Sequence, residues 1–230
     1  MADLKCFAGK CGHGLSLVCL STLAGILAPL IFLAVVAVVE QLQPGYNPLR
    51  DMISKLVLGY YGWFQTLSFF IVGFLLLVFA LRLYSTTLRK TPAKAALFFF
   101  LLWGIGFFII GAFPMALGNT PAMKTSEMVH TAAVGLSGSS FIIGSSIFGM
   151  YFRIDSRWRK FWVYTVLTAI ACLIFFCIWV LTPHEWLWKG LSERLALVIA
   201  LLWVEIVSVR LLMSCVSKSR NEPGPIALGR

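Results

Sequence analysis

The stretch LSLVCLSTLAGILAPLIFLAVVAVV, residues 15–39, decides the fold class of this chain. A helix needs about 20 apolar residues to cross the hydrocarbon core of a bilayer. These 25 uncharged residues are therefore long enough to span it with some tilt. The stretch is too long for the core of a signal peptide, and no small-x-small cleavage site follows it. We expect an uncleaved membrane anchor that Pro29 kinks near its middle.

Five more apolar runs of spanning length follow, over residues 62–84, 95–117, 130–152, 161–182 and 191–216. Only 12% of the residues are charged and 60% are apolar, whereas a soluble domain has about 25% charged residues. The mean hydropathy of +0.90 agrees. The sequence predicts an all-α polytopic membrane protein with six transmembrane helices. We expect a cytoplasmic segment over 1–14, the bundle over 15–216 and a flexible cytoplasmic tail over 217–230.

Basic residues are distributed unevenly between the two sides of the predicted bundle. With six spans both termini share one side, and that side collects 14 of the 19 lysines and arginines. The positive-inside rule makes it the cytoplasmic side. The net charge of +10 then reflects loops that face anionic lipid headgroups, and it does not indicate nucleic-acid binding. We expect a bacterial inner membrane rather than a eukaryotic endomembrane.

The first non-cytoplasmic loop carries an amphipathic segment. Asn47 and Pro48 suit a helix N-cap and the first helical position, and apolar residues follow at helical spacing as far as residue 58. Asp51 and Lys55 form a favourable i,i+4 pair. The pattern predicts a short amphipathic helix that lies in the membrane interface or caps the bundle.

The three non-cytoplasmic loops carry acidic, basic and hydroxyl side chains and histidines. His184 and Glu185 lie in the third of these loops. One polar pocket could be formed by six residues: Asp51, Ser54, Glu127, His130, Glu193 and Arg194. In a catalytic interpretation, His130 is a general base or metal ligand with Ser54, Asp51 or Glu127 as its partner. In the other interpretation, which we favour, the same groups form ion pairs and caps that hold the helices together.

Binding residues form a second set of candidates. Arg194 stands at the start of the sixth span, where an arginine can reach an anionic headgroup. The other candidates are Glu193, Arg50, Asn119 and Glu205. Glu205 is the one acid deep in an apolar run, and carboxylates there are costly and usually functional. A proton-relay role and a hydrogen bond that fixes helix packing are equally open for Glu205.

Sequence motifs for metal and cofactor chemistry are missing. The chain has three histidines and neither an HExxH nor a GxSxG motif. Cys6 and Cys11 lie near His13, but their spacing matches no standard zinc site. We expect no metal and no cofactor. The fourth span is rich in glycine and serine, which permits close helix approach, and we expect it at the centre of the bundle.

Several short motifs in a fixed order resemble the multi-pass proteins catalogued as domain of unknown function 998. They are Tyr46-Asn47-Pro48 before Asp51-x-Ile53-Ser54, Gly111-x-Phe113-Pro114 before a loop ending in His130, and Gly190-Leu191-Ser192-Glu193-Arg194-Leu195 with Trp203 beyond it. The resemblance covers residues 15–215 and implies a six-helix membrane protein with polar outer loops and no settled activity. Such proteins often carry an acid shortly after the Phe-Pro, whereas Met115 follows it in this chain.

Three functions remain open. The first is a membrane protein that binds or moves a lipid-like or small molecule through a polar site at the non-cytoplasmic face. The second is a membrane-embedded hydrolase that acts on lipid with His130 and Ser54 or an acid. The third is a structural subunit of a membrane complex. The expected partners are membrane lipids, a lipid-like small molecule and, for the third function, another membrane protein.

Overall fold

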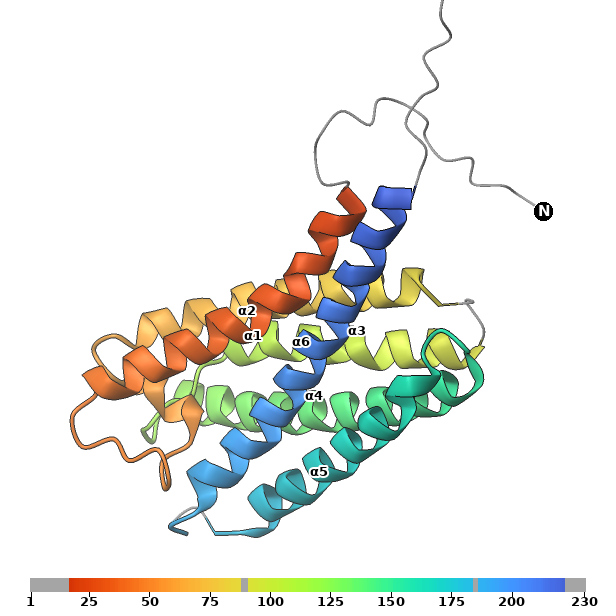
Figure 1. The fold of residues 1–230 in the computed structure, drawn as a ribbon. Helices are drawn as coiled ribbons and strands as arrows, with labels where there is room; N and C mark the ends of the chain where they lie inside the picture. Colours follow the sequence, from red (N-terminus) through yellow and green to blue (C-terminus); the bar gives the residue numbers. More distant parts are fainter. Residues whose placement is uncertain (1–16, 88–90, 184–185, 222–230) are drawn as a thin grey trace, which may run out of the picture.

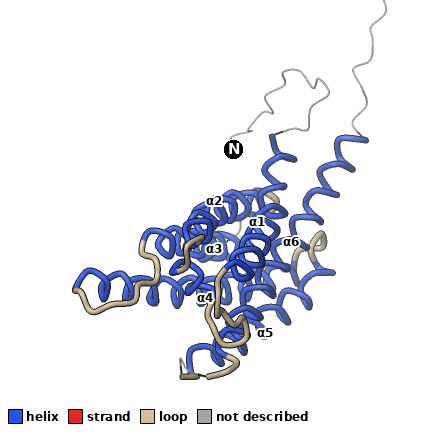
Figure 2. Tube along the Cα trace, turned by 90° about the vertical axis from the view of Figure 1, so that its left-hand side faces the viewer, coloured by secondary structure: helices blue, strands red, loops and turns tan. Residues whose placement is uncertain are grey.

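The computed structural model describes residues 17–87, 91–183 and 186–221, and within these ranges it holds helices and loops but no strand (Figure 2). The α-helices are α1 (Leu17–Leu42), α2 (Gly62–Ser85), α3 (Thr91–Ala112), α4 (Pro121–Ile154), α5 (Trp162–Leu181) and α6 (Lys189–Asn221). Two 3₁₀ helices, η1 (Ile53–Leu58) and η2 (Arg159–Phe161), lie between them. Each of the six α-helices is long and apolar enough to cross a membrane. The all-α, six-span prediction is confirmed.

The helices form a closed bundle in which each packs against its neighbours in the chain (Figure 1). The ring closes because α6 contacts both α5 and α1. The start of α1 and the end of α6 project together beyond the other helices (Figures 1 and 2). We call the opposite end, where α1, α3 and α5 finish and α2, α4 and α6 begin, the site end.

Aromatic side chains fill the middle of the bundle. Trp203 of α6 is fully buried and stacks on Phe100 of α3, with ring centroids 5.4 Å apart and planes 8° from parallel. Phe141 of α4 packs edge-on against Trp203. The indole N–H of Trp203 donates to the Thr165 hydroxyl of α5 at 3.0 Å. Large apolar side chains also cover the outside of the bundle, as expected where the surroundings are lipid.

Some helix limits differ from those that hydropathy predicts. The third helix ends at Ala112, before Phe113 and Pro114. The fourth begins at Pro121, nine residues earlier than expected, because the Thr120 hydroxyl accepts a hydrogen bond from the Met123 N–H and Pro121 occupies the first turn. The sixth continues to Asn221, past the predicted end of the bundle at residue 216.

Helix α4 is one member of the ring, so its predicted central position is wrong. Its main neighbours are α3 and α5, and it reaches α6 through the contact of Phe141 with Trp203. Its small residues serve these two contacts. A Cβ on Gly106 of α3 would come within 2.7 Å of the Ser137 side chain, and one on Gly138 would come within 2.6 Å of the Phe176 ring. Close approach to two neighbours explains the composition of this span.

The short helix predicted after the first span is present as a 3₁₀ helix, and it is shorter than the segment 47–58. The segment forms a turn at 47–51 and then the 3₁₀ helix η1. An α-helix needs each carbonyl to accept from the N–H four residues later. In this segment the Leu49 and Arg50 carbonyls instead accept the N–H groups of Leu191 and Gly190, at 2.9 and 3.2 Å. The first turn of α6 thus takes the hydrogen bonds that a local helix would need.

Candidate functional site

The loop between α1 and η1 is held to α6 by a group of polar contacts that we call the polar clamp: Glu40, Tyr46, Asp51, Glu193 and Arg194. Arg194 is its centre. Its guanidinium donates to the Asp51 carbonyl at 2.8 Å, to Glu40 Oε2 at 3.2 Å and to the Tyr46 hydroxyl, and it lies over the Tyr46 ring. Through these contacts Arg194 joins the start of α6 to the end of α1 and to the loop that follows it.

Tyr46 links the guanidinium to the backbone of the loop. Its hydroxyl donates to the carbonyls of Asp51 and Met52, at 3.1 and 3.0 Å. Burial raises the pKa of Tyr46 to about 12, against the opposing effect of Arg194. The phenol therefore stays protonated at every physiological pH and acts as a permanent donor.

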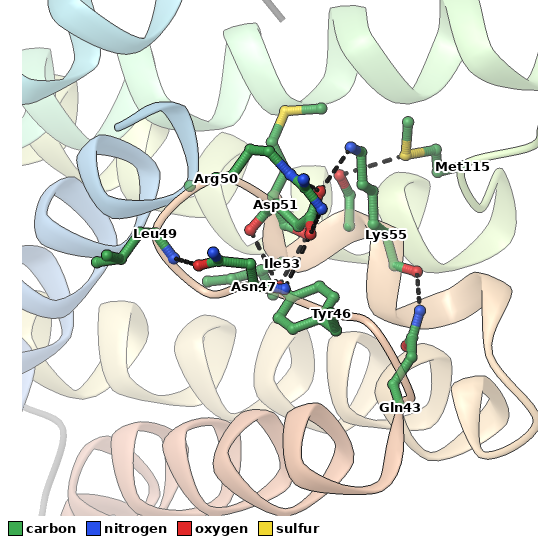
Figure 3. Close-up of polar contacts among 12 residues, drawn as sticks. Gln43, Tyr46, Asn47, Leu49, Arg50, Asp51, Ile53, Lys55 and Met115 are labelled. Carbon is green, nitrogen blue, oxygen red and sulfur yellow. Dashed lines mark hydrogen bonds and ion pairs between the residues drawn. The ribbon is translucent and has the colours of Figure 1, made fainter. Parts of the chain in front are cut away.

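Asp51 forms the outer part of the clamp (Figure 3). Its carboxylate accepts from Lys55 Nζ at 2.9 Å, Arg50 Nη2 at 3.0 Å and the Asn47 N–H at 2.9 Å. Burial alone would raise the pKa of Asp51, but these hydrogen bonds outweigh it and hold that pKa well below its usual range. The predicted Asp51–Lys55 ion pair is present. With its oxygens occupied, Asp51 lines neither of the cavities described next.

Two cavities lie behind the clamp and share part of their walls. The inner cavity, of about 110 Å³, touches all six helices. Its walls are largely apolar and include the aromatic side chains of Phe32, Phe69, Trp103, Phe107, Phe141 and Phe176. The outer cavity, of about 290 Å³, lies toward the site end between η1, α4, α5 and α6. Both are lined by Ser54, His130, Val134, Trp179 and Glu193. These five side chains form what we call the collar between an apolar interior and a polar mouth.

His130 is the most defined member of the collar. It is 5% exposed, and its Nδ1 lies 2.8 Å from the Phe113 carbonyl. A carbonyl can only accept, so in the neutral ring Nδ1 carries the proton and Nε2 presents a lone pair. Among the described residues, Nε2 has no hydrogen-bond partner. His130, which lines both cavities, therefore carries an oriented acceptor without a partner among the described residues.

Two further polar groups of the collar come from α5 and η1. Trp179 Nε1 is buried and also lacks a hydrogen-bond partner in the described part of the chain. The Ser54 hydroxyl donates weakly to the Met115 sulfur at 3.6 Å. At the mouth, the ammonium of the buried Lys189 donates to the carbonyls of Trp179 and Thr182. Glu193 accepts the Ile53 N–H through Oε2 and lines both cavities.

The remaining predicted residues lie outside the collar. Glu127 is exposed and lines only the outer cavity, and Asn119 is exposed and lines neither. Arg50 is exposed and pairs with Asp51. Glu205 is half-buried on α6, about 18 Å from Glu193 along the helix axis by the helical rise.

The site also includes residues that the sequence did not single out. Trp179 lies within the fifth apolar run, and Lys189 and Glu40 lie next to the sixth and first runs, so nothing in the local sequence marks them. Only the packing of α5 and α1 around α6 places them at the site end. His184, Glu185, Cys6, Cys11 and His13 lie outside the described residues. Within the described ranges, no group of three His, Cys, Asp or Glu side chains is placed to hold a metal ion.

Comparison with known proteins identifies a family. Residues 26–210 match the family model described as "Protein of unknown function (DUF998)". The matched range runs from within α1 to within α6 and includes the clamp and the collar. No curated protein and no solved structure matches the chain.

Proposed function

This chain belongs to the DUF998 family of membrane proteins, and we propose that it binds an amphiphilic, lipid-like small molecule at the site end. One observation carries the proposal: an apolar inner cavity and an outer cavity with more polar groups share the collar, where His130 Nε2 and Trp179 Nε1 are both unpaired among the described residues. Ligand pockets are typically apolar with a few convergent polar groups. Buried polar atoms without partners are uncommon in native proteins and call for an explanation.

The dimensions support a ligand whose apolar end enters the inner cavity. An apolar cavity of about 150 Å³ accommodates a benzene ring, so 110 Å³ offers room for a short alkyl stretch or a small ring. The larger outer cavity would receive the polar end. An amphiphile satisfies both environments with one molecule, whereas a wholly polar ligand would leave the aromatic walls without a partner.

A route from the bilayer is supported by the α4–α5 side of the outer cavity. Its lining there includes the exposed residues Thr131 and Val180 together with Gly135. A Cβ placed on Gly135 would meet no atom within 4 Å. Open space beside this glycine offers an entry between the two helices. The biased distribution of basic residues further supports a site end on the non-cytoplasmic face.

Photocrosslinking tests the proposal. The purified protein in detergent micelles would be irradiated with a diazirine-bearing decanol, and the labelled peptides mapped by mass spectrometry. We expect labels on Trp103, Phe107 and Phe141, inside the ring. Gly135→Leu should reduce this labelling by filling the entry. Leu136→Phe, which adds bulk on the exposed side of the same helix, serves as the matched control.

Labels confined to lipid-facing side chains of α5, with no change in Gly135→Leu, would contradict the proposal. Exposed Ile170 and Ile174 report that non-specific labelling. Native mass spectrometry of the same preparation gives an independent readout, because a co-purified lipid lost in Gly135→Leu would point to the same cavity.

Hydrolysis is a second candidate function because one observation favours it. The Phe113 carbonyl orients His130 as a base, and Ser54 lines the same two cavities. The Ser54 hydroxyl donates to Met115 rather than to His130, so a nucleophile–base pair would form only after a change of Ser54 rotamer. Covalent labelling by an alkyl fluorophosphonate that is lost in Ser54→Ala would support this function, and an unlabelled wild-type protein would count against it.

A further inference from the structure

The collar contains two groups of opposite kind that have no partner among the described residues. His130 Nε2 is an acceptor, because the Phe113 carbonyl fixes the proton on Nδ1. Trp179 Nε1–H is a donor and nothing else. Both residues line both cavities, so the junction is the place where one polar head can meet both of them. A head that pairs with both must donate one hydrogen bond and accept another.

The charged residues around the collar further limit which polar heads can bind there. The ionisable residues that line the outer cavity besides His130 are Glu127, Lys189 and Glu193, two acids and one base. The Lys189 ammonium already donates to two carbonyls of the α5 C-terminus. Arg194 lines neither cavity, because the clamp holds its guanidinium. Among the described residues that line the outer cavity, an anionic head would therefore face two acidic side chains against one ammonium, which already donates to two carbonyls.

We propose that the collar selects an amphiphile with an uncharged hydroxyl head, which donates to His130 Nε2 and accepts from Trp179 Nε1–H. This inference rests on the proposed binding function and specifies its ligand. A carboxylate or an ether cannot donate, and an ammonium cannot accept. A hydroxyl does both at one atom, and its alkyl chain can continue into the inner cavity.

Four probes with the same chain separate these cases: decanol, 1-methoxydecane, decanoate and decylammonium. Each would compete with the diazirine-bearing decanol for labelling of Trp103, Phe107 and Phe141. One hydrogen bond contributes about 1 kcal/mol, so decanol should compete about fivefold better than the ether. Decylammonium also loses one hydrogen bond, the one from Trp179, but Glu127 and Glu193 attract its charge, so decanol should exceed it by a smaller factor. Decanoate should be the weakest competitor because of Glu193 and Glu127.

Two variants assign the preference to the two groups. His130→Asn keeps an amide N–H for the Phe113 carbonyl and removes Nε2, so it should abolish the difference between decanol and the ether. Trp179→Phe removes the donor and should abolish the difference between decanol and decylammonium. Asn119→Ala, which is exposed and lines neither cavity, should keep the full order of preference. Size-exclusion profiles establish that each variant remains folded.

The outcomes distinguish this inference from the function on which it rests. If no probe competes and the photolabel never reaches the inner cavity, the binding function itself fails. If decanoate, the ether or decylammonium competes as well as decanol in the wild-type protein, binding stands and the hydroxyl preference is wrong. Equal preferences in wild type, His130→Asn and Trp179→Phe would also overturn the assignment to these two groups.

Discussion

The Glu193 carboxylate accepts a hydrogen bond from the Ile53 backbone N–H, with 2.7 Å between Oε2 and the nitrogen, and so joins α6 to a residue 140 positions earlier in the chain. This N–H belongs to the first residue of η1, where helix donors have no partner of their own. Ile53 and Glu193 both line the inner cavity. One hydrogen bond therefore positions a wall of the candidate site.

Substitution of Glu193 tests this link. Glu193→Ala should lower the free energy of unfolding by about 1–3 kcal/mol, because the buried Ile53 N–H loses its acceptor. Glu193→Gln keeps a carbonyl oxygen at the same place and should retain most of the stability. Thermal unfolding in detergent, followed by circular dichroism, measures both. Equal losses in the two variants would show that the carboxylate charge, rather than the acceptor, matters.

The free energy of unfolding should fall more for the conservative change Arg194→Lys than for Glu193→Gln. Its guanidinium serves Glu40, Tyr46 and the Asp51 carbonyl together, which the single ammonium of a lysine cannot match in geometry. Arg194→Met leaves the largely buried Glu40 without its ion-pair partner and should cost about 2–4 kcal/mol. Arg194→Lys should recover only part of this loss.

A double variant separates charge from packing. If Glu40→Gln restores stability to Arg194→Met, the unpaired carboxylate causes the loss. If it does not, the contacts to Tyr46 and the Asp51 carbonyl account for it. The same melting measurements report both outcomes. A wild-type melting temperature in Arg194→Met would show that the clamp does not hold the loop to α6.

Hydropathy predicts the fold of this chain because each span is a continuous apolar run. Hydropathy does not predict where α4 begins. Its first turns are polar, and the helix starts there because Thr120 caps it. The segment 47–58 departs from the hydropathy prediction for another reason. Its local pattern is helical, but Gly190 and Leu191 compete for its carbonyls from the far end of the chain. The sequence of the segment itself cannot reveal donors that come from residues 190 and 191.

The candidate site was predictable in part. Charged and polar residues in membrane loops are conspicuous, so His130, Ser54 and Glu193 stand out in the sequence. Only the direction of each side chain in the structure shows that these three residues line the cavities, whereas Asp51 and Arg194 do not. Trp179 is one of 8 tryptophans in an apolar sequence. Only the packed structure shows that its N–H is buried and has no hydrogen-bond partner among the described residues.

Acid should weaken the loop between α4 and η2. Hydrogen bonds from Arg157 and Tyr151 hold the pKa of Asp155 at about 2, against the opposing effect of burial. A lowered carboxyl pKa adds stability that is fully present above the ordinary value of about 4 and disappears as the pH falls toward the folded value. Asp155→Asn should lose stability at neutral pH and show a shallower loss between about pH 4 and 2.

Asp51 contributes to the same pH range because its pKa is also depressed. A double variant, Asp51→Asn with Asp155→Asn, should therefore have the flattest profile of melting temperature against pH. A profile in Asp155→Asn as steep as that of the wild-type protein would place the acid sensitivity in other carboxylates.

Gly190 and Gly135 provide the sharpest test of how the site is built. A Cβ on Gly190 would lie 2.4 Å from the Asp51 carbonyl oxygen and 2.8 Å from that of Pro48. Both obstacles are backbone atoms, so the loop itself would have to move. We expect Gly190→Ala to lower the free energy of unfolding by about 1–3 kcal/mol, as overpacking does. It should also weaken labelling of the inner cavity, since the displaced loop carries Ile53 and Ser54.

Gly135→Ala is the matched control, because a Cβ there meets no atom within 4 Å. The added methyl group also favours the helix by up to about 1 kcal/mol. The control should therefore melt at or slightly above the wild-type temperature and label normally. If Gly190→Ala melts and labels like Gly135→Ala, the loop does not depend on its contact with α6. The cavity walls at Ile53 and Ser54 would then have to be held without the Gly190 contact, for example by the hydrogen bond from Ile53 to Glu193.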